Sequence, residues 1–279
     1  MLLACLLVLL NLCQPGATPP PRTPTMTPET LTAQVRAGGS DAVATAAKMG
    51  PSAVPTLKTL AQDKDADVRL TTIRCFDAVG GDAAIDAGVT ALTDPDAQVA
   101  SRAAALLHHH PPKGRGPDLI AAFSRSKEPA VRAEIPKISG RVPTEHDTKV
   151  WEMLLPSVHE PDVRDGVMIG LARMGHQPSR EWFEGKLAAA DGAKALPWLE
   201  AAEYMEDPWV VPTLAKLLNR TTAVYTVSPD FKPQDVRVCD LAAYVIFKIT
   251  GAKVDFPVRK GRYNDVEIDA ARAAAAGKK

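Results

Sequence analysis

Three consecutive histidines, His108, His109 and His110, are the first side chains whose types could do chemistry, because imidazole binds metal ions and transfers protons. Consecutive residues of a helix point about 100° apart, whereas a helix that binds a metal presents its ligands one turn apart. The three histidines also stand where a predicted helix ends before Pro111, and cationic side chains are favoured at that end. We therefore expect a structural role for them and no metal site.

The other motifs offer no catalytic centre. His159-Glu160 begins like the helix of a zinc protease, but Val163 stands where the second histidine would be needed. The sequence has no nucleophile elbow, phosphate-binding loop or dinucleotide-binding glycine motif. Cys75 and Cys239 are too far apart in the sequence to indicate a disulfide framework, and we expect Cys75 to be buried and inert. These motifs predict neither an enzyme nor a bound cofactor or metal.

The composition indicates which kind of secondary structure would position a site. The 279 residues carry 33 basic and 33 acidic side chains, and they are 46% hydrophobic but only 5% aromatic. Zero net charge argues against a nucleic-acid binder, which needs a basic surface. The hydrophobic fraction excludes wholesale disorder, and the abundance of alanine favours helices.

Four segments of the sequence align on a valine, namely Val68, Val99, Val131 and Val163, which are 31, 32 and 32 residues apart. From each valine, apolar residues recur at about plus 4, plus 7 or 8 and plus 11, which is the stripe of an amphipathic helix. Acidic residues precede the valines, where a helix N-terminus favours negative charge, and glycines such as Gly175 follow the stripes. The spacing therefore predicts a helix at the same place in every repeat.

Each of these helices follows another segment that predicts a helix, and the four segments are 51–62, 82–93, 117–125 and 146–157. Every repeat is therefore a pair of helices joined by a short turn. A pair this small cannot bury its own apolar faces, so neighbouring pairs must stack. We expect the second helices to line one surface of the stack and the first helices to line the other.

The pattern is less regular after the fourth repeat. Residues 178–206 and 208–219 predict three further helices, and another follows from Val238. The buried stripe of this helix can be counted from Val236 or from Val238. Counting from Val236 places Asp240 on the stripe, whereas counting from Val238 places only apolar residues there. We prefer the register from Val238 because burying Asp240 without a partner would be costly.

The sequence thus predicts an all-α fold, an α-solenoid of about six stacked helical hairpins over residues 29–251. Residues 29–49 are expected to form a capping hairpin, and a C-terminal extension over 252–279 ends in a helix. One long loop, 220–235, interrupts the last pair of helices.

The opening Asp63-x-Asp65-x-x-Val68-Arg69 and the Val-Arg pairs at 131–132 and 163–164 give the repeat a recognisable form. This pattern resembles HEAT repeats and is most similar to the short HEAT-like subtype of the phycobilisome lyases. The resemblance implies a solenoid that usually binds proteins and seldom catalyses, with pigment attachment as a second function, for which no catalytic motif is present. The resemblance also gives the arginine after the valine a role in bonding within or between neighbouring turns, although Ala100 departs from the pattern. The residues given this role are Arg69, Arg132 and Arg164.

Aromatic residues are concentrated near the C-terminus, where eleven of the fourteen lie from Trp182 onward. Long loops on rigid scaffolds are disproportionately functional, and aromatic residues are enriched in the cores of interfaces. We therefore expect the 220–235 loop to contribute to a protein-binding surface; the alternative is that the loop caps the stack and the aromatic residues fill a wider core. The residues assigned to the surface are Tyr225, Phe231, Trp209 and Arg237.

The N-terminus resembles an export signal. Residues 2–13 are apolar and uncharged, too short to span a bilayer but long enough for a signal peptide, which we place at 1–17, before a Pro/Thr-rich linker at 18–28. Cys13 is a possible lipid attachment site, although Leu12 stands where such signals have a small residue. Translation from Met26 would instead give a cytoplasmic protein.

Together these observations predict a non-catalytic, monomeric scaffold that binds a protein partner and is exported to the periplasm or cell envelope. It would have no nucleic-acid partner and no transmembrane span, and it would meet the membrane only through a lipid anchor at Cys13. The alternative function is an enzyme or enzyme subunit of the lyase type on the same scaffold.

Overall fold

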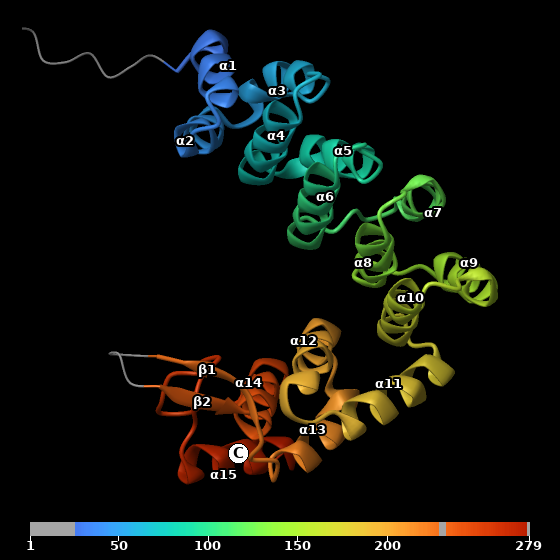
Figure 1. The fold of residues 1–279 in the computed structure, drawn as a ribbon, viewed down its shortest axis with the longest axis vertical. Coiled ribbons are helices and arrows are strands. Elements are labelled where there is room, and N and C mark those ends of the chain that lie inside the picture. The colour runs from blue at the N-terminus through green and yellow to red at the C-terminus, as the bar shows by residue number, and fades with distance from the viewer. Residues whose placement is uncertain (1–25, 229–232, 278–279) are drawn as a thin grey trace, which may run out of the picture. The chain divides into compact units, whose positions relative to one another are not determined.

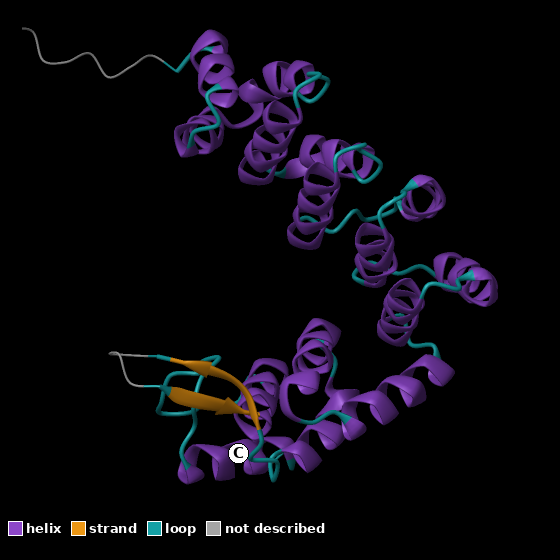
Figure 2. Ribbon diagram, viewed as in Figure 1, coloured by secondary structure: helices purple, strands orange, loops and turns teal. Residues whose placement is uncertain are grey.

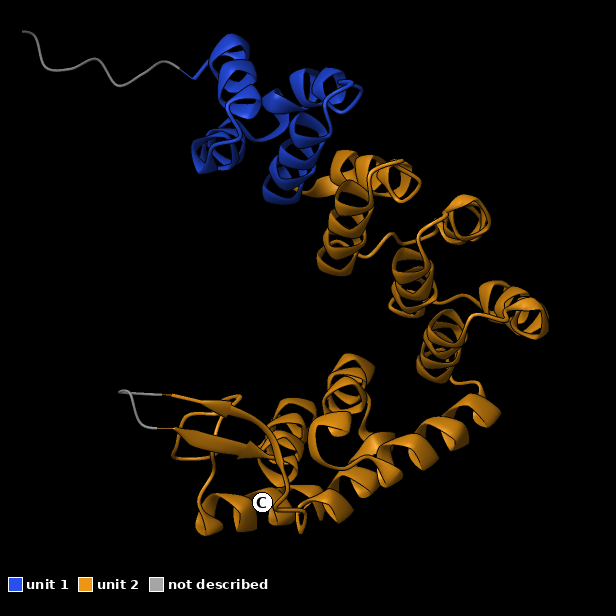
Figure 3. Ribbon diagram, viewed as in Figure 1, with its two compact units in different colours: residues 1–79 blue, residues 80–279 orange. Residues whose placement is uncertain are grey.

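The computed structural model describes residues 26–228 and 233–277, and these are helical almost throughout (Figure 2). The chain forms two compact units, residues 1–79 and 80–279 (Figure 3). In the described residues, no helix combines the length and the apolar character that crossing a membrane requires. The predicted all-α class is confirmed.

The first unit consists of two helical hairpins. Its helices are α1 (Pro28–Arg36), α2 (Ser40–Met49), α3 (Val54–Leu60) and α4 (Ala66–Val79), with a short 3₁₀ turn, η1 (Gly50–Ala53), before α3. The Thr27 side chain accepts a hydrogen bond from the backbone N–H of Thr30 and so caps α1, while Pro28 occupies the first turn, where a missing N–H costs nothing. The core of the unit includes Leu31, Leu57 and Phe76, which are fully buried.

The second unit begins with three hairpins that follow the predicted repeat. Their helices are α5 (Gly81–Ala91) with α6 (Ala97–His109), α7 (Gly116–Arg125) with α8 (Pro129–Gly140), and α9 (Glu145–Leu154), extended by η2 (Leu155–Ser157), with α10 (Pro161–Arg173). The valines that anchor the repeat, Val99, Val131 and Val163, are buried as the stripe requires. The helices predicted from the 32-residue period are confirmed.

Within this unit the two kinds of helix lie on different faces. Helices α6, α8 and α10 stand side by side, and α5, α7 and α9 cover their other side (Figure 1). We call the surface formed by α6, α8 and α10 the second-helix face.

The rest of the second unit is a less regular bundle. Its helices are α11 (Gln177–Ala189), α12 (Leu196–Met205), α13 (Val211–Leu217), α14 (Val238–Thr250) and α15 (Asp265–Ala275), with 3₁₀ turns η3 (Gly192–Ala195) and η4 (Pro208–Val210). Helix α14 is buried over most of its length because α12, α13 and α15 pack around it, and only Lys248 and Thr250 among its residues are exposed. Tyr263 and Phe183 are among the largest side chains in the core of this bundle.

The segment expected as a long loop contains a β-hairpin. Strand β1 (Ala223–Val227) pairs antiparallel with β2 (Gln234–Arg237), and a register shift lies between Ala223 and Tyr225. Val224 of β1 and Val236 of β2 are buried, while the exposed Thr226 donates a hydrogen bond to the side chain of Asp235 opposite it, at 2.7 Å. The helical repeat did not predict this strand pair.

The contact between α8 and α10 depends on glycine. A methyl group at Gly166 would overlap the backbone carbonyl of Ala133, and one at Gly170 would overlap that of Pro136. The two helices therefore touch backbone to backbone, which brings the outward-facing side chains of both onto one surface.

We expect Gly166→Ala to destabilise the second unit by about 1–3 kcal/mol, because the added methyl group meets backbone atoms that cannot rotate away. The matched control is Gly185→Ala on α11, where an added methyl group contacts nothing and helix propensity should raise stability by about 0.5–1 kcal/mol. Urea unfolding monitored by circular dichroism measures both. Equal effects of the two substitutions would contradict the packing.

Candidate functional site

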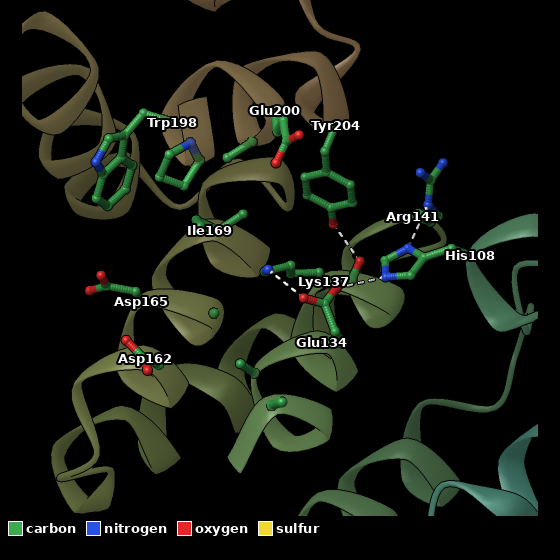
Figure 4. Close-up of a pocket in the computed structure, with 15 residues that line it drawn as sticks. His108, Glu134, Lys137, Arg141, Asp162, Asp165, Ile169, Trp198, Glu200 and Tyr204 are labelled. Carbon is green, nitrogen blue, oxygen red and sulfur yellow. Dashed lines mark hydrogen bonds and ion pairs between the residues drawn. The ribbon is translucent and has the colours of Figure 1, made fainter. Parts of the chain in front are cut away.

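A pocket of about 680 Å³ opens on the second-helix face where α8, α10 and α12 meet (Figure 4). We call it the second-helix pocket. Pro197, Trp198, Glu200, Ala201 and Tyr204 of α12 form one wall, and His108 and Arg141 close one end. All of its residues belong to the second unit.

The lining positions of α8 and α10 follow the repeat. In both helices they are the residue before the anchor valine and those two, three and six positions after it, which share one helix face. The residues concerned are Ala130, Ala133, Glu134 and Lys137 on α8, and Asp162, Asp165, Gly166 and Ile169 on α10. This exposed stripe was not predicted from the buried one, although its spacing is present in the sequence.

One end of the pocket is a network of paired charges. Glu134 bonds to Nε2 of His108 at 3.0 Å and to Nζ of Lys137 at 2.7 Å. Arg141 donates to Nδ1 of His108 at 3.2 Å, so this nitrogen is the acceptor and Nε2 carries the proton donated to Glu134. Burial would raise the pKa of the Glu134 carboxyl, but the bonds to His108 and the charge of Lys137 outweigh it and lower the pKa to about 2. Glu134 is therefore ionised and held, not available as an acid.

Tyr204 ties α12 to the second-helix face. Its hydroxyl donates to the backbone carbonyl of Lys137, and its ring lies between the guanidinium groups of Arg141 and Arg173, at 5.3 and 4.8 Å from the ring centroid. Arg173 donates to the carbonyl of Tyr204 and pairs with Glu206 at 2.7 Å. Burial raises the pKa of the Tyr204 phenol. The tyrosine therefore acts as a neutral structural donor.

The opposite end of the pocket carries carboxylates without partners. Among the described residues, no hydrogen bond or ion pair is formed by the side chains of Asp162 and Asp165, which project from α10, or by that of Glu200, which lies on the α12 wall between Trp198 and Tyr204 (Figure 4). Burial raises the pKa of the Asp165 carboxyl. The pocket thus combines an apolar wall with exposed negative charge.

Of the described residues predicted to form a protein-binding surface, Tyr225 and Arg237 lie on the paired strands β1 and β2, whereas Trp209 lies in η4. Tyr225 lines a smaller cavity of about 250 Å³ together with Leu241 and Tyr244 of α14, and Glu200 lines both this cavity and the second-helix pocket. Trp209 packs edge-on against Phe183, with ring centroids 5.8 Å apart, and lies under the guanidinium of Arg180. Phe231 lies outside the described residues.

Arg237 is directed into the protein. It bonds to both carboxylate oxygens of Asp240, at 3.0 and 2.8 Å, and to the backbone carbonyl of Tyr263 at 2.9 Å. Asp240 is fully buried, so the expectation that it lies outside the core is wrong. It can be buried because Arg237 and the backbone N–H of Tyr263 satisfy its oxygens.

The repeat arginines bond in two ways. Arg69 donates to the backbone carbonyls of Asp63 and Lys64, and Arg164 donates to that of Leu155, so both close the turn of their own hairpin. Arg132 instead pairs with Glu160 at the start of the next second helix.

The thiols and metal ligands form no centre in the part of the chain that the structure describes. Cys75 and Cys239 are buried and free, and burial raises the pKa of both thiols, that of Cys75 to about 11. No group of three or more His, Cys, Asp or Glu side chains within residues 26–228 and 233–277 is placed to hold a metal ion. Cys13 and the predicted signal peptide lie outside the described residues, as does most of the predicted linker.

Comparison with known proteins places the fold. No protein-family model matches the sequence, and no curated protein matches it. Among solved structures, the chain is similar to the complex of CpcE and CpcF of phycocyanin lyase from Nostoc sp. PCC7120, with 15% identity, a TM-score of 0.54 and coverage of 94% of this chain and 100% of that one. An engineered protein gives 18% identity and a TM-score of 0.35 over 90% of this chain and 68% of its own, which is too remote to support an argument. The helical-repeat solenoid predicted from the sequence is thereby confirmed.

Asp240→Ala should lower the free energy of unfolding by about 3–5 kcal/mol, because it leaves the guanidinium of Arg237 without its buried partner. Asp255→Ala, at an exposed aspartate without a recorded contact, is the control and should change stability by less than about 0.5 kcal/mol. Denaturant unfolding measures both. A loss below about 1 kcal/mol for Asp240→Ala would contradict the role given to the ion pair.

Glu134 should stabilise the fold in a pH-dependent way. Its pKa is lowered from 4.5 to about 2, so its contribution is complete above the ordinary value and is lost as the pH falls towards about 2. We expect the difference in melting temperature between the wild type and Glu134→Gln to shrink steadily over that interval. Glu184→Gln on α11 is the control, and a difference for Glu134→Gln that stays constant with pH would contradict the network.

Proposed function

We propose that the protein is a non-catalytic, protein-binding scaffold that takes up its partner on the second-helix face, with the second-helix pocket at the centre of the contact. The observation that carries this proposal is the pocket itself, a cavity of about 680 Å³ with an apolar wall and exposed charge. Concave sites with apolar walls and a few polar groups are the usual places where side chains or ligands dock.

The state of the polar groups supports binding over catalysis. A general acid or base needs a free proton site near its substrate, and His108, Glu134 and Tyr204 are all engaged with neighbouring protein groups. Asp165, whose pKa is raised by burial, is the group in the pocket that the lyase-type alternative would use. The complex of CpcE with CpcF also supports it, because there a similar fold is found bound to another protein chain.

Export to the cell envelope is part of the proposal and rests on the apolar residues 2–13. The lyase-type alternative rests on the likeness to a phycocyanin lyase, which concerns the fold. A scaffold releases its bound protein unchanged, whereas a lyase-type enzyme would modify it covalently. One experiment can therefore separate the two functions.

The experiment compares Ala130→Trp with Ala121→Trp. Ala130 is exposed at the pocket, so an indole there should fill it, whereas Ala121 is exposed on α7, outside the pocket. C-terminally tagged protein is captured from the envelope fraction of its own cells, and co-purifying proteins are quantified by mass spectrometry. We expect Ala130→Trp to lose a partner by about tenfold or more. Ala121→Trp should retain it at an unchanged melting temperature.

Each other outcome has a definite meaning. A partner kept by Ala130→Trp would refute the pocket as the contact, and absence of the tagged chain from the envelope would refute export. A captured partner whose intact mass increases by the mass of a pigment, after incubation with the wild type and that free pigment, would favour the lyase-type function.

A further inference from the structure

We propose that the second-helix pocket recognises a lysine or arginine side chain of the partner, inserted together with a neighbouring apolar residue. This inference rests on the proposed function, since it names the chemistry of the partner at the same site. It follows from the distribution of charge, from the aromatic wall and from the size of the cavity.

The charge of the pocket favours a cation. Glu134, Asp162, Asp165 and Glu200 line it, against Lys137 and Arg141. Both cations are already engaged, Lys137 with Glu134 at 2.7 Å and Arg141 with His108 at 3.2 Å. Asp165 also lies in the field of Lys186, Arg164 and Lys137, so the negative charge left unpaired at the open end is that of Asp162 and Glu200. These two carboxylates attract a basic side chain and repel phosphate or nucleic acid.

The aromatic wall supplies the second requirement of a lysine or arginine site. Such side chains bury their methylene stems on apolar surface and place the charge over an aromatic ring or against a carboxylate. Trp198, Pro197 and Ile169 offer this surface, and the aspartates of α10 stand beside it (Figure 4). Nζ of Lys186 already lies 5.6 Å from the centroid of the Trp198 ring, so an incoming basic group would be placed against the carboxylates and only its methylene stem against the apolar surface.

The size of the pocket points to a protein segment. A cavity of about 680 Å³ lies in the range that holds a drug-sized molecule, so a basic side chain leaves room for the residue next to it. A bare divalent ion does not fit the observation, since no cluster within the described residues has three side chains placed to ligate a metal. The favoured occupant is therefore a peptide segment in which a basic residue adjoins an apolar one.

The test uses a positional peptide library and a pair of matched variants. Nonapeptides with randomised flanks carry one fixed residue at the centre, and binding to wild-type protein is measured by fluorescence anisotropy. The pocket variant is Asp162→Asn with Asp165→Asn, which removes two charges and keeps the shape of both side chains. The control is Asp82→Asn with Asp255→Asn, which removes the same charge from exposed positions outside the pocket. Asp82 lies in the first turn of α5, as Asp162 lies in the first turn of α10, so both variants lose one favourable helix-terminal charge.

We expect central arginine or lysine to bind at least about tenfold more tightly than central citrulline, glutamine or glutamate. The preference should disappear in the pocket variant and persist in the control variant, with both variants retaining the helical spectrum of the wild type. Competition by spermidine as strong as by the arginine peptides would instead assign the pocket to a free amine and overturn the proposal. No preference for a basic residue, or no binding of any peptide, would also overturn it.

Failure here is distinguishable from failure of the proposed function. If Ala130→Trp releases the captured partner while the peptides show no basic preference, the pocket is a protein contact with another chemistry. If Ala130→Trp keeps the partner, the protein-binding role of the pocket itself is wrong.

Discussion

The close approach of α8 and α10 determines the second-helix face. Gly166 and Gly170 let the backbone of α10 lie directly against that of α8, so the outward stripes of the two helices become one continuous surface. With larger residues at these positions the helices would stand further apart and the floor of the pocket would open. The same contact places Lys137 where its carbonyl can accept the hydroxyl of Tyr204.

A second set of polar contacts joins the regular repeats to the bundle that follows. Arg173 at the end of α10 binds the carbonyl of Tyr204 and the carboxylate of Glu206, a residue with a left-handed backbone at a φ of 51°. This arrangement ends α12 and aims its exposed side towards the pocket. The chain no longer follows the repeat at α14 and the C-terminal segment. There the side chain of Arg237 joins the two by bonding to the Asp240 carboxylate and to the backbone carbonyl of Tyr263, and the N–H of Tyr263 also donates to Asp240.

The helices were predictable from the sequence because burial of one stripe repeats with a fixed period, and Val99, Val131 and Val163 lie where that period places them. The burial of Asp240 was not predictable, because it depends on Arg237 and on the backbone N–H of Tyr263, 23 residues away. The β-hairpin was predicted only as a long loop, because strands of five and four residues with a register shift show no clear period of two. The pocket could not be predicted because it is lined by three helices, α8, α10 and α12. The spacing of residues within α8 or α10 does not indicate that α12 packs against both.

The hydrogen bond from Tyr204 to Lys137 joins residues 67 positions apart and connects hairpins that are not consecutive. In a simple repeat array each unit contacts only its neighbours, so unfolding can begin at one unit and stop at the next. A bond that spans α9, α10 and α11 removes that independence, because α12 cannot separate without disturbing α8. The stretch from α8 to α12 should therefore open and close as one cooperative block, which keeps the geometry of its surface constant.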